Sequence, residues 1–171
     1  KETVSTLGII TLEDTIDLKT LEPTAMSLAT VSDSGQPSLR TVLLKGITEN
    51  GFVFYTNYES RKGNEINENS KVSLCFLWKE LERQVTIRGK AERTSQKTSK
   101  QYFSSRPKGH QISAWASTQS AEIPNRQWMV DREEKIASRF GSEKIPYPEF
   151  WGGFNVEPKE VEFWQGRENR L

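Results

Sequence analysis

The sequence predicts a mainly β protein, an antiparallel β-barrel with a few helices inserted between its strands. Short segments rich in β-branched and aromatic residues follow one another closely from residue 23 onwards, with turn residues between them. The helical segments do not alternate regularly with these strands, which favours an antiparallel over a parallel sheet. Only 34% of the residues are hydrophobic, although 10% are aromatic, so we expect a thin core or one that a second copy of the chain completes.

The first three strands are expected near the start of this region. Ala25–Val31 and Ser38–Gly46 flank a segment of turn-forming residues, Ser32–Pro37. A second turn at Glu49–Gly51 leads into Phe52–Thr56, a short run of aromatic and β-branched residues. Each of these strands is therefore predicted to follow the previous one through a short turn.

Two further strands are expected after a short helix. Asn57–Asn69 has few β-branched residues and is predicted to contain that helix, and Val72–Trp78 and Arg83–Arg93 follow as strands. In the second of these strands, apolar or small side chains alternate with polar ones, which predicts one buried face. The alternating residues are Val85, Ile87 and Gly89 on one side and Thr86, Arg88 and Lys90 on the other.

The second half of the chain is predicted to be richer in helix. We expect a helix over Thr94–Ser105 that ends before Pro107, then loop or short helix over residues 106–124. A longer helix is predicted over Asn125–Phe140, because its large apolar residues recur with helical spacing. That apolar face consists of Trp128, Met129, Ile136 and Phe140.

The C-terminal part is expected to return to strands. Pro146 and Pro148 are predicted to break the long helix. Two strands, Trp151–Val156 and Glu160–Gln165, would then complete the sheet. The glycines after Trp151 indicate a tight bend of the barrel rather than a binding site.

Residues 1–22 show little pattern and are predicted to be an N-terminal arm, with a possible helix around Leu12–Leu21, while residues 23–171 are predicted to form one barrel domain. The formal net charge of +1 gives no overall field that would select nucleic acid or an anionic membrane. No apolar run approaches the ~20 residues of a membrane span, and no signal peptide is visible. We therefore expect a soluble, cytoplasmic protein.

The composition also excludes several kinds of catalytic site. The single cysteine, Cys75, excludes a disulfide framework and is expected to be an inert core residue. No cluster of His, Cys and carboxylates has the spacing of a metal site, so no metal is predicted. The only histidine is His110, and the motifs GxGxxG, GxxxxGK[ST] and GxSxG are absent. An enzyme with this sequence would take its chemistry from an organic cofactor.

Basic residues at the ends of predicted elements are candidates for phosphate binding. Ser60, Arg61 and Lys62 open a helix, whose N-terminus offers free N–H groups and a partial positive charge. Arg40 and Lys45 flank a predicted strand, and a guanidinium group can bind two phosphate oxygens at once. The alternative is that these residues are ordinary solvated charges, the usual state of Arg and Lys.

A second candidate cluster is Tyr102, Arg106 and Lys108, at the end of a predicted helix. These side chains could hold a second phosphate, or the two cations could simply stabilise the helix C-terminus. Trp164 and Gln165 could contact a flat ring, although a tryptophan in a strand is more often part of the core.

These residues occur in eight short motifs whose order resembles that of the pyridoxamine 5′-phosphate oxidase family. The resemblance runs from about Pro23 to Leu171 without an obvious break. The motifs are RTVLLK (40–45), FYTN (54–57), SRK (60–62), ERQV (82–85), YFxSRP (102–107), QS (119–120), WGG (151–153) and EFWQG (162–166).

The resemblance implies a split β-barrel homodimer that binds FMN at the subunit interface. The implied FMN contacts are Arg40, Thr41, Val42, Leu43, Leu44, Lys45, Tyr55, Thr56, Arg61, Lys62, Gln84, Gln119, Ser120 and Trp164. The implied substrate contacts are Lys45, Tyr102, Arg106, His110, Arg170 and Leu171, with Arg170 over the substrate ring as the catalytic residue.

The reaction implied by the resemblance is oxidation of pyridoxamine 5′-phosphate or pyridoxine 5′-phosphate to pyridoxal 5′-phosphate. A hydride passes from the substrate C4′ carbon to N5 of the flavin, and O2 reoxidises the flavin and gives H2O2. The protein would place that carbon and neutralise two phosphates, while the cofactor accepts the electrons.

Three differences from the family pattern keep other functions open. His110 stands where the family usually has serine, and an ordinary loop histidine is the alternative to a phosphate contact. The family ending Arg-Leu-His-Asp-Arg stops here at Leu171, so we expect a tail beyond it, and residues 1–22 lack the basic, tyrosine-containing segment of some members. The alternatives are a split-barrel flavoprotein with another substrate, a flavin reductase, or a non-catalytic carrier of FMN or pyridoxal phosphate. A nucleic-acid-binding barrel is disfavoured by the neutral charge.

Overall fold

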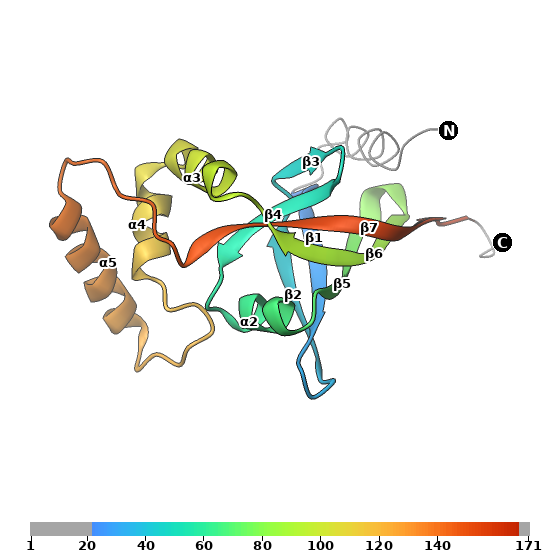
Figure 1. The fold of residues 1–171 in the computed structure, drawn as a ribbon, viewed down its shortest axis with the longest axis horizontal. Coiled ribbons are helices and arrows are strands. Elements are labelled where there is room, and N and C mark those ends of the chain that lie inside the picture. The colour runs from blue at the N-terminus through green and yellow to red at the C-terminus, as the bar shows by residue number, and fades with distance from the viewer. Residues whose placement is uncertain (1–21, 168–171) are drawn as a thin grey trace. The chain divides into compact units, whose positions relative to one another are not determined.

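The computed structural model describes residues 22–167, in which seven strands form one sheet in the order β2-β1-β5-β6-β7-β4-β3 (Figure 1). The strands are β1 (Ala25–Val31), β2 (Pro37–Leu43), β3 (Gly46–Thr48), β4 (Gly51–Asn57), β5 (Lys71–Trp78), β6 (Arg83–Arg93) and β7 (Trp151–Gln165). The helices are α2 (Arg61–Glu68), α3 (Gln96–Ser105), α4 (Lys108–Ala116) and α5 (Arg126–Phe140), and a 3₁₀ turn occupies Lys79–Leu81.

The predicted fold class is confirmed. β1 pairs antiparallel with both β2 and β5, β3 with β4, and β5 with β6. The helix predicted around Leu12–Leu21 lies outside the described residues, as do Arg170 and Leu171. The division into an arm and one barrel domain stays a prediction.

The described chain forms two compact units. The first contains residues 22–54, 65–92 and 154–167, and the second contains residues 55–64 and 93–153. The boundary between them falls within β4, α2, β6 and β7, so these elements contribute residues to both units.

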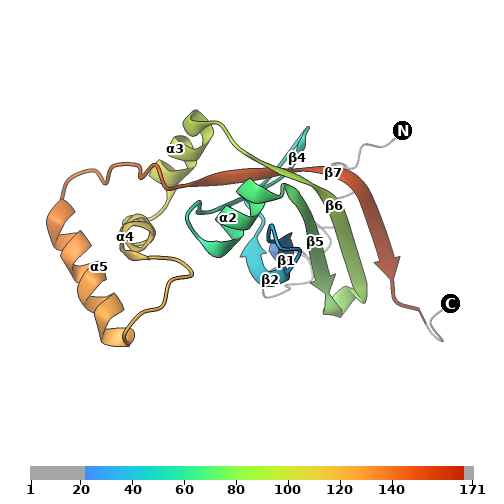
Figure 2. The same ribbon diagram turned by 60° about the horizontal axis from the view of Figure 1, so that its bottom comes forward.

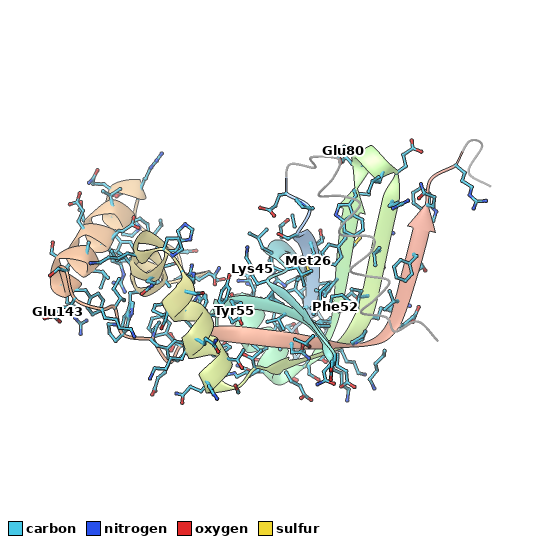
Figure 3. All side chains as sticks on the ribbon, turned by 90° about the horizontal axis from the view of Figure 1, so that it is seen from above. Met26, Lys45, Phe52, Tyr55, Glu80 and Glu143 are labelled. Atoms are coloured by element: carbon cyan, nitrogen blue, oxygen red, sulfur yellow. The ribbon has the colours of Figure 1, made fainter. Side chains whose placement is uncertain are left out.

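The first unit has its core on one face of the sheet, because side chains in a strand alternate between faces. Along β1, Met26 and Leu28 are buried and alternate with partly exposed residues. β5 and β6 repeat the pattern, with Leu74 opposite Ile87, both fully buried. β5, β6 and β7 lie side by side along the curled sheet (Figure 2). Glu80 marks the tip of the β5–β6 connection (Figure 3).

The opposite face of this sheet is exposed and partly apolar. Leu77 is 54% exposed and Leu39 is 70% exposed. Cys75 lies on this face between the inward-pointing Leu74 and Phe76, and it is only partly buried. The prediction that Cys75 is a core residue was therefore wrong, because alternation along β5 turns it away from the core.

The strand predicted over Ser38–Gly46 is interrupted in the structure. The N–H of Leu44 donates to Thr24 O, beside β1, whereas the N–H of Lys45 donates to Val53 O in β4. The chain therefore changes hydrogen-bonding partner between two consecutive residues. Since β2 and β3 lie at opposite ends of the strand order, this step links the two ends of the curled sheet, as in a barrel.

The last strand is longer than predicted. We expected two strands separated near Pro158, but β7 is continuous from Trp151 to Gln165. Gly51, the first residue of β4, lies against Val156, so β7 runs on past the end of β4. A strand tolerates a proline where no neighbouring strand needs its N–H, and β4 ends beside Val156, two residues before Pro158.

The second unit contains α3, α4 and α5, and Figure 1 shows α4 and α5 side by side. Asn125 caps α5 by accepting the N–H of Trp128. The helix ends at Gly141, whose φ of 50° favours glycine, so the prediction that the later prolines end it was wrong. The core of this unit is Phe103, Ala114, Phe140, Ile145 and Trp151.

Candidate functional site

The first candidate site lies in the second unit, around a buried lysine in the first turn of α2. Lys62 is only 6% exposed, and its Nζ donates to Thr56 Oγ1 at 3.2 Å and to Ser60 Oγ at 3.3 Å. The Ser60 oxygen also accepts the N–H of Gly63 and donates to Asn57 O. A buried ammonium group, hydroxyls and the start of a helix make a site suited to an anion such as phosphate.

Gln119 extends this hydrogen-bonded group. Its Oε1 accepts from Thr56 Oγ1 at 3.0 Å and from the N–H of Asn57 at 3.3 Å. Since a backbone N–H can only donate, the amide oxygen must face β4, and the amide NH2 points away from it. The next residue, Ser120, has φ of 71°, in the left-handed region. The structure thus brings together Thr56, Lys62 and Gln119, three of the predicted FMN contacts.

The second candidate site, also in the second unit, is an aromatic stack with a buried cation. Tyr55 and Tyr102 stack with ring centres 3.8 Å apart, and Tyr55 also stacks on Trp151 at 5.4 Å. The guanidinium carbon of Arg106 lies 4.6 Å from the centre of the Trp151 ring. Tyr55 and Tyr102 are both half-buried, and burial raises the pKa of each hydroxyl.

Arg106 carries an unsatisfied buried donor. Among the buried side-chain nitrogen and oxygen atoms of residues 22–167, Arg106 Nη1 is the one without a hydrogen-bond partner. Burial lowers the pKa of this guanidinium, and the nearby Tyr102 hydroxyl partly opposes that effect. A buried donor without an acceptor costs about 1–3 kcal/mol, so the group is arranged for a ligand that supplies one. An oxyanion fits this requirement best.

The first unit contains Arg40, on β2. Its Nη2 forms an ion pair with Glu65 Oε2 at 3.2 Å, and its Nη1 donates to Leu28 O and to the Thr30 hydroxyl. The alternative of an ordinary solvated charge is therefore wrong for Arg40, and burial makes it wrong for Lys62. Arg61 and Lys45 are exposed, so for them that alternative stays open.

A third set of predicted contacts lines a surface pocket of the first unit. Gln84 on β6 and Trp164 on β7 meet there, in a cavity of about 190 Å³ that also includes Phe163. Trp164 is 52% exposed, so the alternative that it belongs to the core was wrong. Gln84 and Trp164 thus lie together in the structure, although they are 80 positions apart in sequence.

The remaining predicted residues are more dispersed. Lys45 lies between β2 and β3 (Figure 3), and His110 is exposed in the first turn of α4. Lys108 donates its Nζ to Gly141 O, so it stabilises the end of α5 and does not join Tyr102 and Arg106. The others lie along and just after β2, namely the exposed Thr41, the half-buried Val42 and Leu43, and the buried Leu44.

Two supporting residues were missed by the sequence analysis. Trp151 was interpreted as part of a bend, but its ring lies beneath Arg106. Glu65 was not considered, yet it is 6% exposed and forms an ion pair with Arg40. No local sequence pattern identified either role, because both depend on contacts between residues distant in sequence.

Within residues 22–167, no group of three His, Cys, Asp or Glu side chains could hold a metal ion. No helix in the same range is long and apolar enough to cross a membrane.

The fold and these sites define an FMN-binding split-barrel protein. A pyridoxamine 5′-phosphate oxidase-related, FMN-binding protein from Nostoc punctiforme superposes with a TM-score of 0.76 over 96% of this chain and 86% of that one, at 14% identity. Residues 12–140 match the model of the pyridoxamine 5′-phosphate oxidase family, and residues 151–171 match the pyridoxine 5′-phosphate oxidase C-terminal dimerisation region. The chain belongs to the pyridoxamine 5′-phosphate oxidase family.

Relatives with higher sequence identity carry the name pyridoxine/pyridoxamine 5′-phosphate oxidase. A pyridoxine/pyridoxamine 5′-phosphate oxidase of Rippkaea orientalis is 56% identical over 88% of this chain and 71% of its own length. One from Burkholderia mallei is 52% identical over 93% of this chain and 74% of its own. The structure of PhzG from Burkholderia lata, in complex with tetrahydrophenazine-1-carboxylic acid, superposes with a TM-score of 0.91 at 28% identity, over 97% of this chain and 81% of that one.

FMN is the cofactor of this family, and the residues present fit it. The buried ammonium of Lys62 and its hydroxyl neighbours suit a phosphate group. The exposed Trp164 ring beside Gln84 suits a flat ring system.

Proposed function

We propose that this protein is an FMN-dependent oxidase that converts pyridoxamine 5′-phosphate or pyridoxine 5′-phosphate to pyridoxal 5′-phosphate. The amine reaction consumes O2 and water and releases ammonia and H2O2, while the alcohol reaction consumes O2 and releases H2O2. The relatives that share more than half of their aligned residues with this chain support the proposal. The observation that carries it is the buried Nη1 of Arg106 near Tyr102, which finds no acceptor within residues 22–167.

The proposed substrate site uses these side chains for binding and orientation. Arg106 supplies a charged donor to the substrate phosphate, and Tyr102 supplies a hydroxyl donor. Lys45 and His110 are proposed as further phosphate contacts, and Arg170 and Leu171 as contacts of the substrate ring. Arg170 would act as the catalytic residue by holding the ring in place.

The proposed FMN contacts fall in both units. In the second unit they are Tyr55, Thr56, Arg61, Lys62, Gln119 and Ser120, and in the first unit they are Arg40, the segment Thr41–Lys45, Gln84 and Trp164. Lys62 and Thr56 would bind the phosphate, and Gln119 would donate its amide N–H to the cofactor. The cofactor, when bound, supplies the acceptor for the hydride that leaves the substrate carbon.

We also propose that the protein is a homodimer. The match to a dimerisation region over residues 151–171 supports this. So do Leu39 and Leu77, two large apolar side chains that are exposed on the same face of the sheet.

Anaerobic mixing of the FMN-loaded protein with pyridoxamine 5′-phosphate tests the oxidase function. We expect the flavin absorbance near ~450 nm to be lost, and to return on admission of air with formation of pyridoxal 5′-phosphate and H2O2. Bound FMN that stays oxidised with both vitamers would refute the proposal and favour a carrier function.

A second candidate function is oxidation of an aromatic carboxylate. The likeness to PhzG in complex with tetrahydrophenazine-1-carboxylic acid favours it. Arg106 would pair with a carboxylate as readily as with a phosphate, and the stacked Tyr55 and Tyr102 suit a flat ligand. Flavin reduction by such a compound, but not by the phosphorylated vitamers, would identify this function instead.

A further inference from the structure

Arg40 is held by three neighbours in the first unit. The Thr30 hydroxyl accepts from Arg40 Nη1 and donates to Glu65 Oε2, the same oxygen that Nη2 of Arg40 contacts at 3.2 Å. Leu28 O accepts a second hydrogen bond from Nη1 at 3.3 Å. Thr30 is fully buried and Glu65 is 6% exposed, so this is a built arrangement and not a surface ion pair.

The hydrogen bonds leave one edge of the guanidinium group available. A guanidinium group has five N–H donors in one plane. Both hydrogens of Nη1 are used by Leu28 and Thr30, and because Thr30 bridges Nη1 to the carboxylate, Glu65 must lie at the tip of the group. Within residues 22–167, the Nε–H and the second Nη2–H have no partner. These two lie on the same side and form a fork for a pair of acceptor atoms.

Glu65 is itself fixed in position. Its second oxygen, Oε1, accepts from Ser38 Oγ at 2.7 Å, so both carboxylate oxygens are engaged by residues of β1 and β2. Burial by itself raises the pKa of this carboxyl, but the hydrogen bonds from Thr30, Ser38 and Arg40 outweigh burial and lower the pKa below its usual value. Glu65 is therefore an anion in the folded protein at neutral pH.

We propose that Glu65 is a positioning residue for FMN. It holds the tip of Arg40 so that the Nε–H and Nη2–H edge is presented to acceptor atoms of the cofactor. The proposal rests on the proposed contact between Arg40 and FMN. It adds that the geometry of this contact depends on a residue of α2 that does not itself bind the ligand.

Two effects of Glu65 on FMN binding oppose each other. Its negative charge near Arg40 weakens attraction for a phosphate group, whereas the fixed geometry of Arg40 removes the entropic cost of ordering a long side chain on binding. Arg40 makes three hydrogen bonds to buried or backbone acceptors, and we expect positioning to be the larger effect. Removing the carboxylate therefore weakens FMN binding.

The test is a double-mutant cycle read by FMN titration of the apoprotein, followed by quenching of flavin fluorescence. Glu65→Gln is expected to raise the Kd for FMN about tenfold, within the range found for residues that interact directly. In the Arg40→Gln background the same change should alter Kd by less than about twofold, because Glu65 acts through Arg40. Glu68→Gln, an exposed carboxylate in the same helix, is the matched control and should leave Kd unchanged.

Three results would overturn the proposal. They are an equal loss of affinity from Glu65→Gln in both backgrounds, an unchanged Kd, or tighter binding. Should Glu65→Gln fail to fold, Thr30→Val and Thr30→Ser replace it. The valine variant removes the bridging hydroxyl and should weaken FMN binding, whereas the serine variant keeps it and should restore affinity. Equal affinities for these two variants would refute the role of the bridge.

This experiment also separates the inference from the proposed function. FMN titration requires no substrate. If the Kd for FMN shows that Glu65 and Arg40 are coupled, the inference holds even for a protein that does not oxidise the vitamers. Conversely, an Arg40→Gln variant with unchanged Kd for FMN would refute the inference, whatever the substrate proves to be.

Discussion

The guanidinium group of Arg106 lies over the ring of Trp151, with its central carbon 4.6 Å from the ring centre. Its Nη1 is buried, and within residues 22–167 it has no hydrogen-bond partner. The contact with the ring stabilises the folded protein by about 0.5–2 kcal/mol, while an unsatisfied buried donor destabilises it by about 1–3 kcal/mol. The arrangement adds little stability, which supports the proposed role of Arg106 in binding the substrate.

Arg106→Gln is the direct test of that use. We expect KM for pyridoxamine 5′-phosphate to rise roughly 10–100-fold, because a charged hydrogen bond to phosphate is lost. The free energy of unfolding of the ligand-free protein should change by less than about 1 kcal/mol, since the lost ring contact and the removed orphan donor offset each other. Steady-state kinetics and urea denaturation measure the two quantities.

The control for this change is Arg139→Gln. Arg139 is exposed and lies over Phe140 at 5.3 Å, so it has a similar ring contact without a buried donor. This variant should keep its KM. A large rise in KM for both variants would show that the effect of Arg106 is one of general charge.

Tyr102 and Tyr147 provide a matched pair of hydroxyl groups. Within the described residues, the Tyr102 hydroxyl makes no hydrogen bond, whereas the Tyr147 hydroxyl donates to Trp151 O. Tyr102→Phe should raise KM about tenfold with unchanged stability, and Tyr147→Phe should lower the free energy of unfolding by about 1 kcal/mol with unchanged KM. The reverse assignment of the two effects would contradict the proposed substrate site.

The lowered pKa of the Glu65 carboxyl group predicts that the stability of the protein depends on pH. Its pKa in the folded protein lies below the ordinary value of 4.5, because the hydrogen bonds from Thr30, Ser38 and Arg40 outweigh burial. A depressed folded pKa means that the contribution is complete above the unfolded pKa and is lost as pH falls through the folded pKa.

The difference in unfolding free energy between the native protein and Glu65→Gln should therefore be largest near neutral pH, at about 2 kcal/mol. It should shrink as pH falls below about 4.5. Urea denaturation over a series of pH values measures it, with Glu68→Gln as a variant that should show no such trend. A difference that grows on acidification would contradict the arrangement around Glu65.

The strand pattern and the resemblance together predicted most of this fold. The alternation in β6 correctly identified its buried face, and the Asn125 cap set the start of α5. The predictions failed where partners distant in sequence decide the structure. The step from Leu44 to Lys45 separates β2 from β3 because these residues bond to different strands, and β7 passes Pro158 because β4 ends beside Val156.

The candidate sites, too, could be predicted from the sequence only where contacts between distant residues do not decide the role. Motifs identified Lys62, Gln84, Arg106 and Trp164, whose residue types alone suggest anion or ring binding. The motifs did not indicate a role for Glu65, since a glutamate in a polar helix is usually solvated. Its role depends on the register of β1 and β2, which sets Leu28 opposite Arg40 and so brings Thr30 within reach of the guanidinium group.

Gly152 has no room for a side chain. A Cβ there would lie 2.1 Å from the Tyr58 hydroxyl and 2.7 Å from Ser99 Oγ, whereas a Cβ at Gly109 in α4 would meet nothing within 4 Å. Gly152→Ala should lower the free energy of unfolding by about 1–3 kcal/mol, and Gly109→Ala should raise it by about 0.5–1 kcal/mol. Thermal or urea denaturation of both variants checks the contrast. A neutral Gly152→Ala would contradict the close approach at the start of β7.

The exposed face of the sheet predicts how the dimer can be broken. Leu77 is 54% exposed on β5, and its neighbour across the strand pair is Gln84, a proposed FMN contact. A glutamate at position 77 would bury a charge if this face is covered by a second copy, at a cost of several kcal/mol. Leu77→Glu should therefore shift the protein from dimer to monomer in light scattering after size exclusion, and weaken FMN binding with it. Val130→Glu, at a 39% exposed position on α5, should remain dimeric. A dimeric Leu77→Glu variant with unchanged FMN affinity would show that this face of the sheet is not the interface.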